Sequence, residues 1–293
     1  MAVLGEGCRR RPERLFALGA FLLPVKSAPA RQLQKRYYAS SKPMILTIEH
    51  GAVRELRLNR PPVNALSGEL IIALKQAIQS APADGVRALV LSGTPGRFSG
   101  GLDVPLLLGL DRPAMAVLWR DFYGLLHAMA ASPIPIVAAI TGHAPAGGTV
   151  LALFCDWRVM AQGDYKLGLN EVQVGIPLPP VIMAGLRRLV GPRSAEHLSV
   201  SGALISPQEA HEVGMVDELA PLEQVVDRAL QRCQRLLALP AEAMLATRRE
   251  ARADLVALFE ADLERELKKV IEAWWHPTTQ NTLRDLAVRL GKK

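Results

Sequence analysis

Apolar and polar residues alternate in two short runs near the start of the chain, residues 45–48 and 53–58. Strict alternation is the pattern of strands with one buried face. The dipeptide His50-Gly51 between the runs is suited to a tight turn. We therefore expect a β-hairpin at the start of the folded region.

A different spacing follows the hairpin, where apolar residues recur at the intervals of a helix face. They are Leu70, Ile71, Leu74, Ala77 and Ile78. This is the period of an amphipathic helix, and Ser67 stands where an N-cap would satisfy the first free N–H groups. We expect this helix to pack on the hairpin.

Compact apolar runs then alternate with helical spacing. Residues 87–91 and 135–140 predict buried strands, and the segment 115–131 between them predicts a helix. Shorter strand candidates follow at 157–161 and 165–169. Buried strands that alternate with helices are typical of an α/β fold with a parallel sheet.

Beyond Pro180 almost nothing has the pattern of a strand, and the last third of the chain is predicted to be helical. The chain is expected to break at His276-Pro277. The expected helices cover residues 221–239, 240–253, 254–275 and 278–290.

The composition is that of a globular protein, since 49% of the 293 residues are hydrophobic and 22% are charged. Intrinsic disorder is therefore excluded. Cys8, Cys155 and Cys233 are odd in number and form no CxxC pair, so we expect inert thiols in a reducing compartment. The longest membrane candidate, 15–25, has about half of the roughly 20 residues that crossing a bilayer takes. No membrane span is expected.

The net charge of +7 is confined to one end of the chain. Residues 1–43 hold nine basic and two acidic residues, which accounts for the whole excess. The remaining residues are neutral on balance. A neutral body argues against binding nucleic acid and leaves at most a local basic pocket for a small phosphorylated ligand.

The first 43 residues are interpreted as a leader without a catalytic role. They are rich in Arg and poor in acidic residues, like a mitochondrial transit peptide. A start codon placed too early is the alternative, because Met44 directly precedes the first strand. The run 15–25, followed by small residues at 28–30, also imitates a secretory signal. The protein is expected in the cytoplasm if Met44 is the true start and in the mitochondrial matrix if the leader is a transit peptide.

Two glycine-rich segments, 97–103 and 142–149, each stand between a strand-like run and a helix-like one. Glycine lets another group approach the backbone N–H groups, and a helix starting near Gly147 would leave its first N–H groups free. Two such loops side by side could hold one oxygen atom, as an oxyanion hole does. Either loop alone is more often only a turn. No GxGxxG, P-loop or GxSxG pattern competes with this interpretation.

Glu171 is a lone carboxylate among apolar residues in the segment 168–177. Burial without a partner charge disfavours the ionised form, so the pKa of this carboxyl should rise toward neutrality. Such a group is suited to general acid–base catalysis. The alternative is a Glu that holds a backbone turn or points into solvent.

Taken together, these motifs resemble the crotonase superfamily, also called the enoyl-CoA hydratase/isomerase family. The resemblance runs from about Met44 to the C-terminus, in the same order along the chain. It rests on residues 59–66 (NRPPVNAL), 98–103 (FSGGLD), 145–148 (PAGG) and 155–158 (CDWR).

The resemblance implies an α/β fold in which residues 44–220 form a spiral core of ββα units and 221–293 form a helical trimerisation region. It implies a homotrimer or hexamer and an acyl-CoA thioester substrate, with no metal and no cofactor beyond the coenzyme A of the substrate. The backbone amides of Leu102 and Gly147 would form the oxyanion hole. The residues placed around the substrate are Val63, Gly100, Gly101, Asp103 and Val104.

One position distinguishes reactions within the family. Hydratases carry two glutamates that hold and activate water, and here the earlier of the two positions is Val150 while the later is Glu171. A single carboxylate suffices to move a proton from C2 to C4, so the pattern is similar to that of Δ3,Δ2-enoyl-CoA isomerases of fatty acid β-oxidation. Hydration or another crotonase reaction is the first alternative, and an acyl-CoA-binding protein without activity is the second.

Overall fold

The predicted hairpin forms one edge of a six-stranded sheet in the computed structural model, which describes residues 43–260 and 263–291. The expected leader, 1–43, lies outside the described residues apart from Pro43, and so does Cys8. All described residues belong to one unit of the chain, Ser40–Lys293.

The sheet joins an antiparallel hairpin to a series of parallel strands. Its order is β1-β2-β3-β5-β7-β9, in which β1 and β2 are antiparallel and every later pair is parallel. The strands are β1 (Ile45–His50), β2 (Val53–Leu58), β3 (Ala88–Ser92), β5 (Ile136–Ile140), β7 (Trp157–Ala161) and β9 (Glu218–Ala220). The strands predicted before residue 162 are confirmed. The short β9 lies where almost no strand was expected, because three residues are too few to show alternation.

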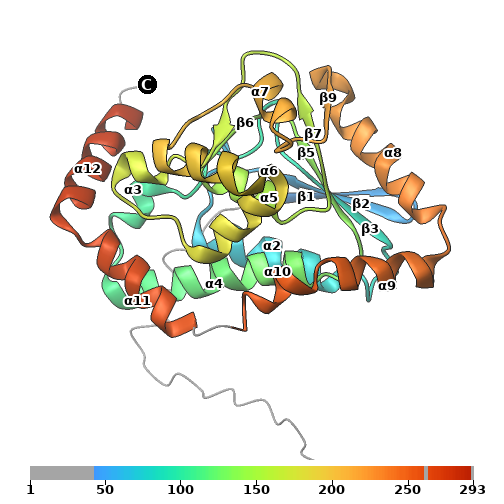
Figure 1. The fold of residues 1–293 in the computed structure, drawn as a ribbon, viewed down its shortest axis with the longest axis horizontal. Helices are drawn as coiled ribbons and strands as arrows, with labels where there is room; N and C mark the ends of the chain where they lie inside the picture. The colour runs from blue at the N-terminus through green and yellow to red at the C-terminus, as the bar shows by residue number, and fades with distance from the viewer. Residues whose placement is uncertain (1–42, 261–262, 292–293) are drawn as a thin grey trace, which may run out of the picture. The chain divides into compact units, whose positions relative to one another are not determined.

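Helices cover both faces of this sheet, as parallel strands require. They are α2 (Gly68–Ser80), α4 (Arg112–Ala130) and α8 (Val225–Leu237). The first two share a core with Leu89 and Ile136, whereas α8 packs with Val90 and Val137 on the other face. Figure 1 shows α8 on the side of the sheet opposite to α2 and α4. The predicted α/β class is confirmed.

Side-chain caps fix where the first helices begin. The N–H of Leu70 donates to Ser67 Oγ at 3.3 Å, so α2 starts at the predicted N-cap. Asp111 caps α4 in the same way, accepting from the N–H of Ala114 at 2.8 Å. Each cap satisfies one N–H that would otherwise lack a partner.

A second, smaller sheet carries the glycine-rich loops. It consists of three parallel strands in the order β4-β6-β8. Its strands and the short helices that follow them are β4 (Gly96–Arg97), α3 (Val104–Leu107), β6 (Gly142–Pro145), α5 (Gly147–Leu153), β8 (Leu167–Gly168) and the 3₁₀ helix η1 (Glu171–Val174). The strand predicted at 165–169 is thus only two residues long, because only Leu167 and Gly168 are in register with residues of β6.

The rest of the chain is mainly helical. Its elements are α6 (Pro180–Ser201), α7 (Pro207–Glu212), η2 (Leu222–Gln224), α9 (Ala241–Ala251), α10 (Ala253–Ala257), α11 (Leu263–Trp274) and α12 (Pro277–Gly291). The helix α6 was not predicted, because it is interrupted at Gly191 and Pro192 and so has no continuous apolar stripe. The single helix expected at 254–275 is wrong. The chain turns after α10, and Phe259 packs 5.3 Å from His127 and 5.8 Å from Phe154 between ring centroids.

Candidate active site

Three loops leave the small sheet at the same edge. Because β4, β6 and β8 are parallel neighbours, their carboxyl ends lie side by side. The loop 98–103 follows β4, Gly147 comes two residues after β6, and Glu171 comes three residues after β8. The structure therefore brings together the three predicted site segments, which are far apart in the sequence.

Asn64 fixes the first of these loops. It is fully buried and has a φ of 52°, a conformation that Asn tolerates better than most residues. Its side-chain amide donates to the carbonyls of Arg97 at 3.2 Å and Phe98 at 3.1 Å, and its own carbonyl accepts from Ser99 Oγ at 2.8 Å. This role of Asn64 was not predicted from the sequence, because its partners lie more than 30 residues away along the chain.

Leu102 lies between two hydrogen bonds that join its neighbours to Leu66. The N–H of Leu66 donates to the carbonyl of Gly101 at 2.7 Å, and the N–H of Asp103 donates to the carbonyl of Leu66 at 3.1 Å. Within the described part of the chain, the N–H of Leu102 has no backbone acceptor. It is thus held in place by its neighbours and free to donate.

Gly147 brings a second amide to the same place. A Cβ on Gly147 would lie 3.3 Å from the nitrogen of Leu102, and a Cβ on Gly101, whose φ is +83°, would lie 3.0 Å from the nitrogen of Gly147. The two loops approach so closely that a side chain at either position would push its neighbours away by a few tenths of an ångström. Ala146 has a φ of 47°, which costs about 1–3 kcal/mol for a residue other than Gly. This turn starts α5 at Gly147, so the amide nitrogens of Leu102 and Gly147 lie close together where the two loops meet.

Glu171 is the first residue of η1. It follows β8, the strand that pairs with β6 in the small sheet. Its Oε2 is buried, with no hydrogen-bond partner among the described residues. Burial raises the pKa of Glu171 to about 7, as the sequence analysis predicted, and no charged neighbour contributes to the shift. A carboxyl with this pKa can take up and release a proton near neutral pH.

Val150 lies in α5, one helical turn after the Gly147 amide, and is 1% exposed. Its side chain has no group that could bind water. Position 150 of α5 thus supplies no second carboxylate to act together with Glu171.

The other predicted substrate-binding residues surround the Leu102 amide. A Cβ on Gly100 would lie 3.1 Å from Val63 Cγ2, so Val63 packs directly on the loop. Asp103 accepts from Arg60 at 2.5 Å and from an N–H in the first turn of α3, which leads the chain into Val104. The carboxylate of Asp103 is therefore engaged within the protein.

The described residues contain no group of three or more His, Cys, Asp or Glu side chains that could hold a metal ion. Among the helices described, none is both long enough and apolar enough to cross a membrane.

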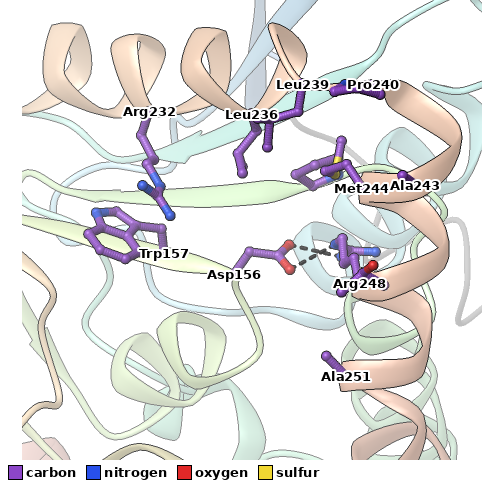
Figure 2. A pocket seen from close by; sticks show the side chains of 12 residues that line it. Asp156, Trp157, Arg232, Leu236, Leu239, Pro240, Ala243, Met244, Arg248 and Ala251 are labelled. Carbon is purple, nitrogen blue, oxygen red and sulfur yellow. Dashed lines mark hydrogen bonds and ion pairs between the residues drawn. The ribbon is translucent and has the colours of Figure 1, made fainter.

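A cavity of about 510 Å³ lies elsewhere in the molecule, under the turn between α8 and α9 (Figure 2). The guanidinium of Arg232 lies over the ring of Trp157, 3.8 Å from its centroid, and Arg248 forms an ion pair with Asp156 at 2.8 Å. The three candidate catalytic positions do not line this cavity. The Asp156 pair therefore anchors α9 to the core rather than forming part of the site.

This chain is similar to known proteins in both sequence and structure. The family model described as enoyl-CoA hydratase/isomerase matches residues 49–281. A mouse protein named enoyl-CoA delta isomerase 1, mitochondrial, is 36% identical over 236 residues, which are 78% of this chain and 82% of that protein. A putative enoyl-CoA hydratase of Thermus thermophilus is 35% identical over 190 residues, 63% of this chain and 74% of that protein.

Among solved structures, the crystal structure of human mitochondrial delta3-delta2-enoyl-CoA isomerase superimposes with a TM-score of 0.82 and 31% sequence identity. The match covers 85% of this chain and 99% of the human one. The α/β fold of this chain is thus shared with almost the whole of the human structure.

Proposed function

The chain belongs to the enoyl-CoA hydratase/isomerase family, and from this premise we propose that it moves the double bond of a 3-enoyl-CoA thioester to give trans-2-enoyl-CoA. The resemblance drawn from the four motifs and the crotonase-type fold is confirmed. The observation that carries the isomerase function is the carboxylate of Glu171, whose Oε2 is buried without a hydrogen-bond partner among the described residues, with the apolar Val150 where a hydratase has its other glutamate.

In the proposed reaction the amides of Leu102 and Gly147 bind the thioester oxygen. Removing a proton from C2 spreads the electron pair over the acyl group and places negative charge on that oxygen. Two fixed N–H donors stabilise this charge without having to reorganise. The loss of one such donor typically slows a reaction by about a hundred- to a thousandfold.

Glu171 moves the proton. As a carboxylate it accepts the C2 proton, which breaks the C2–H bond and leaves a dienolate. As a carboxylic acid it then donates that proton to C4, and the double bond comes to rest between C2 and C3. A pKa of about 7 makes both forms accessible at neutral pH. The enzyme ends in its starting state, and no further reactant is consumed.

Hydration is the second candidate, because the Thermus thermophilus relative bears a hydratase name. It requires a water molecule that is held and activated beside the conjugated double bond. Val150 is apolar and buried, so the position that would orient this water in a hydratase cannot do so. This observation favours the isomerase.

The two reactions are separated by one spectroscopic experiment on the purified full-length chain. With 3-hexenoyl-CoA an isomerase increases the absorbance of the conjugated 2-enoyl thioester. With trans-2-hexenoyl-CoA a hydratase decreases it. Fast growth on the first substrate and little loss on the second would support the proposal, and hydration as fast as isomerisation would refute it. Binding without turnover would indicate the acyl-CoA-binding alternative.

The family resemblance also leads us to propose assembly into a homotrimer or hexamer. Large apolar side chains are exposed on the described chain, and three of them lie in or beside the helices expected to mediate assembly. These three are Leu239, Leu258 and Val288. Light scattering at micromolar concentration tests the assembly, and a stable, active monomer would contradict it.

We propose that residues 1–43 direct the protein to the mitochondrial matrix. Their Arg-rich, acid-poor composition and the mitochondrial names of the mouse and human relatives support this. Expression of the full chain with a C-terminal fluorescent tag tests it. Cytoplasmic fluorescence would favour Met44 as the true start.

A further inference from the structure

The hydroxyl of Thr149 lies where β6, β8 and α5 meet. Thr149 is the third residue of α5, and its side chain is fully buried. Its Oγ1 donates to the carbonyl of Ala144 at 2.5 Å and accepts from the N–H of Gly168 at 2.8 Å. One oxygen atom thus joins a helix, the strand that leads into it and the neighbouring strand.

Both hydrogen-bond partners of Thr149 lie shortly before a candidate catalytic group in the sequence. Ala144 lies in β6, three residues before the Gly147 amide, and Gly168 lies in β8, three residues before Glu171. The hydroxyl therefore links the two chain segments, one leading to the Gly147 amide and the other to Glu171, just before each leaves the small sheet.

Gly168 is held on all sides. Its N–H donates to Thr149, and its carbonyl accepts from the N–H of Ala146 at 2.8 Å. A Cβ on Gly168 would lie 2.3 Å from the carbonyl oxygen of Ala203, so the backbone of that residue closes off the remaining side. The start of the Glu171 loop can move only if the contacts with β6 and α5 change.

We propose, on the basis of the isomerase function above, that Thr149 is a positioning residue that fixes the separation between the Gly147 amide and the Glu171 carboxylate. The substrate must reach both groups at once, because its oxygen binds the amide while C2 and C4 face the carboxylate. A displacement of about 1 Å between groups that act on one substrate can cost about a hundredfold in rate. Thr149 touches no reacting atom and acts through the two strands that it joins.

The test compares two changes at this position with a matched control. Thr149→Val keeps the shape but removes the hydroxyl, and Thr149→Ser keeps the hydroxyl but removes the methyl group. Thr141→Val is the control, since Thr141 is also buried and donates to backbone carbonyls, those of Thr94 at 3.1 Å and Arg97 at 3.5 Å, without linking β6 to β8. Measurements on the full chain are kcat and KM for 3-hexenoyl-CoA and the thermal unfolding temperature.

We expect kcat to fall by about a hundredfold in Thr149→Val, with little change in KM. Thr149→Ser should restore most of the activity, and Thr141→Val should lower thermal stability at nearly constant kcat. If both valine variants lose stability and keep kcat, Thr149 is merely structural. Activity lost equally in the serine and valine variants would show that the retained hydroxyl does not rescue the reaction, and it would also overturn the proposal.

A further variant and a spectroscopic measurement cover the cases in which Thr149→Val does not fold or the wild type does not isomerise. Should Thr149→Val not fold, Thr149→Cys replaces the hydroxyl by a weaker donor and acceptor, and an unchanged kcat would refute the positioning role. Should the wild type not isomerise, the proposed function fails, and the thioester carbonyl stretch of bound hexanoyl-CoA reports on the site instead. A shift toward the free thioester in Thr149→Val supports the positioning role, and an unchanged stretch overturns it.

Discussion

Replacing Glu171 by Gln should greatly slow the isomerisation and, at neutral pH, remove the cost of burying an ionised carboxylate. Gln keeps the size of the side chain and most of its polarity but cannot take a proton from C2. We expect isomerisation to fall by about a hundred- to ten-thousandfold, the contribution of a positioned general base. Binding of acyl-CoA should change little, because the amides of Leu102 and Gly147 remain.

The magnitude of the stability effect follows from the pKa of Glu171. Burial raises this pKa from its ordinary value of 4.5 to about 7, which corresponds to about 3 kcal/mol between the two protonation states. Between these pH values the folded chain holds a proton that the unfolded chain has lost. The free energy of unfolding therefore falls as the pH rises from 4.5 through 7, and the stabilisation of the protonated form is lost above 7.

Urea unfolding of wild type and Glu171→Gln at about pH 4 and about pH 9 measures this effect. The stability of the wild type relative to the variant should fall by about 3 kcal/mol across that interval. A constant offset between the two proteins, such as the cost of an unpaired Gln amide, cancels in the comparison. If the difference does not depend on pH while turnover per folded molecule is retained, Glu171 is a structural turn residue and the assignment is refuted.

Three further changes probe other parts of the site. Gly148→Ala would place a Cβ 2.5 Å from the carbonyl oxygen of Ser99, so we expect α5 to shift and kcat for 3-hexenoyl-CoA to fall by about a hundredfold. Val150→Glu should introduce some hydration of trans-2-hexenoyl-CoA, measured as loss of absorbance, whereas the matched Val150→Gln should not. A chain that starts at Met44, without residues 1–43, should keep its circular dichroism spectrum and turnover; loss of either would show that the leader belongs to the fold.

Much of the fold follows from local pattern, because each early strand and helix has a length and spacing of its own. The hairpin at 45–58 and the helix after Ser67 were predictable from alternation and an N-cap. The errors come where tertiary contacts decide. The two-residue strands of the small sheet have no period at all, and the division of the helix expected at 254–275 depends on the packing of Phe259 against rings far away in the sequence.

The candidate catalytic residues were more predictable from the sequence than the hydrogen bonds that hold them in place. A carboxylate among apolar residues signals a raised pKa in any fold that buries it, and that prediction for Glu171 is confirmed. What cannot be seen in one sequence is which polar side chain binds which distant carbonyl. Asn64 and Thr149 are ordinary residues in the sequence, and only the fold brings them to the strand ends that they join.

The burial of Glu171 Oε2 has a consequence for the proton that the carboxylate removes from C2. This oxygen is buried and has no hydrogen-bond partner among the described residues, so in the proposed mechanism no neighbouring side chain takes over the proton that it accepts from C2. The hydrogen that leaves C2 is then the one that arrives at C4. Both bonds also lie on the same side of the acyl chain, because one carboxylate reaches them in turn. The proposed mechanism therefore predicts that an isotopic label at C2 is retained in the product and that the reaction follows a single stereochemical course.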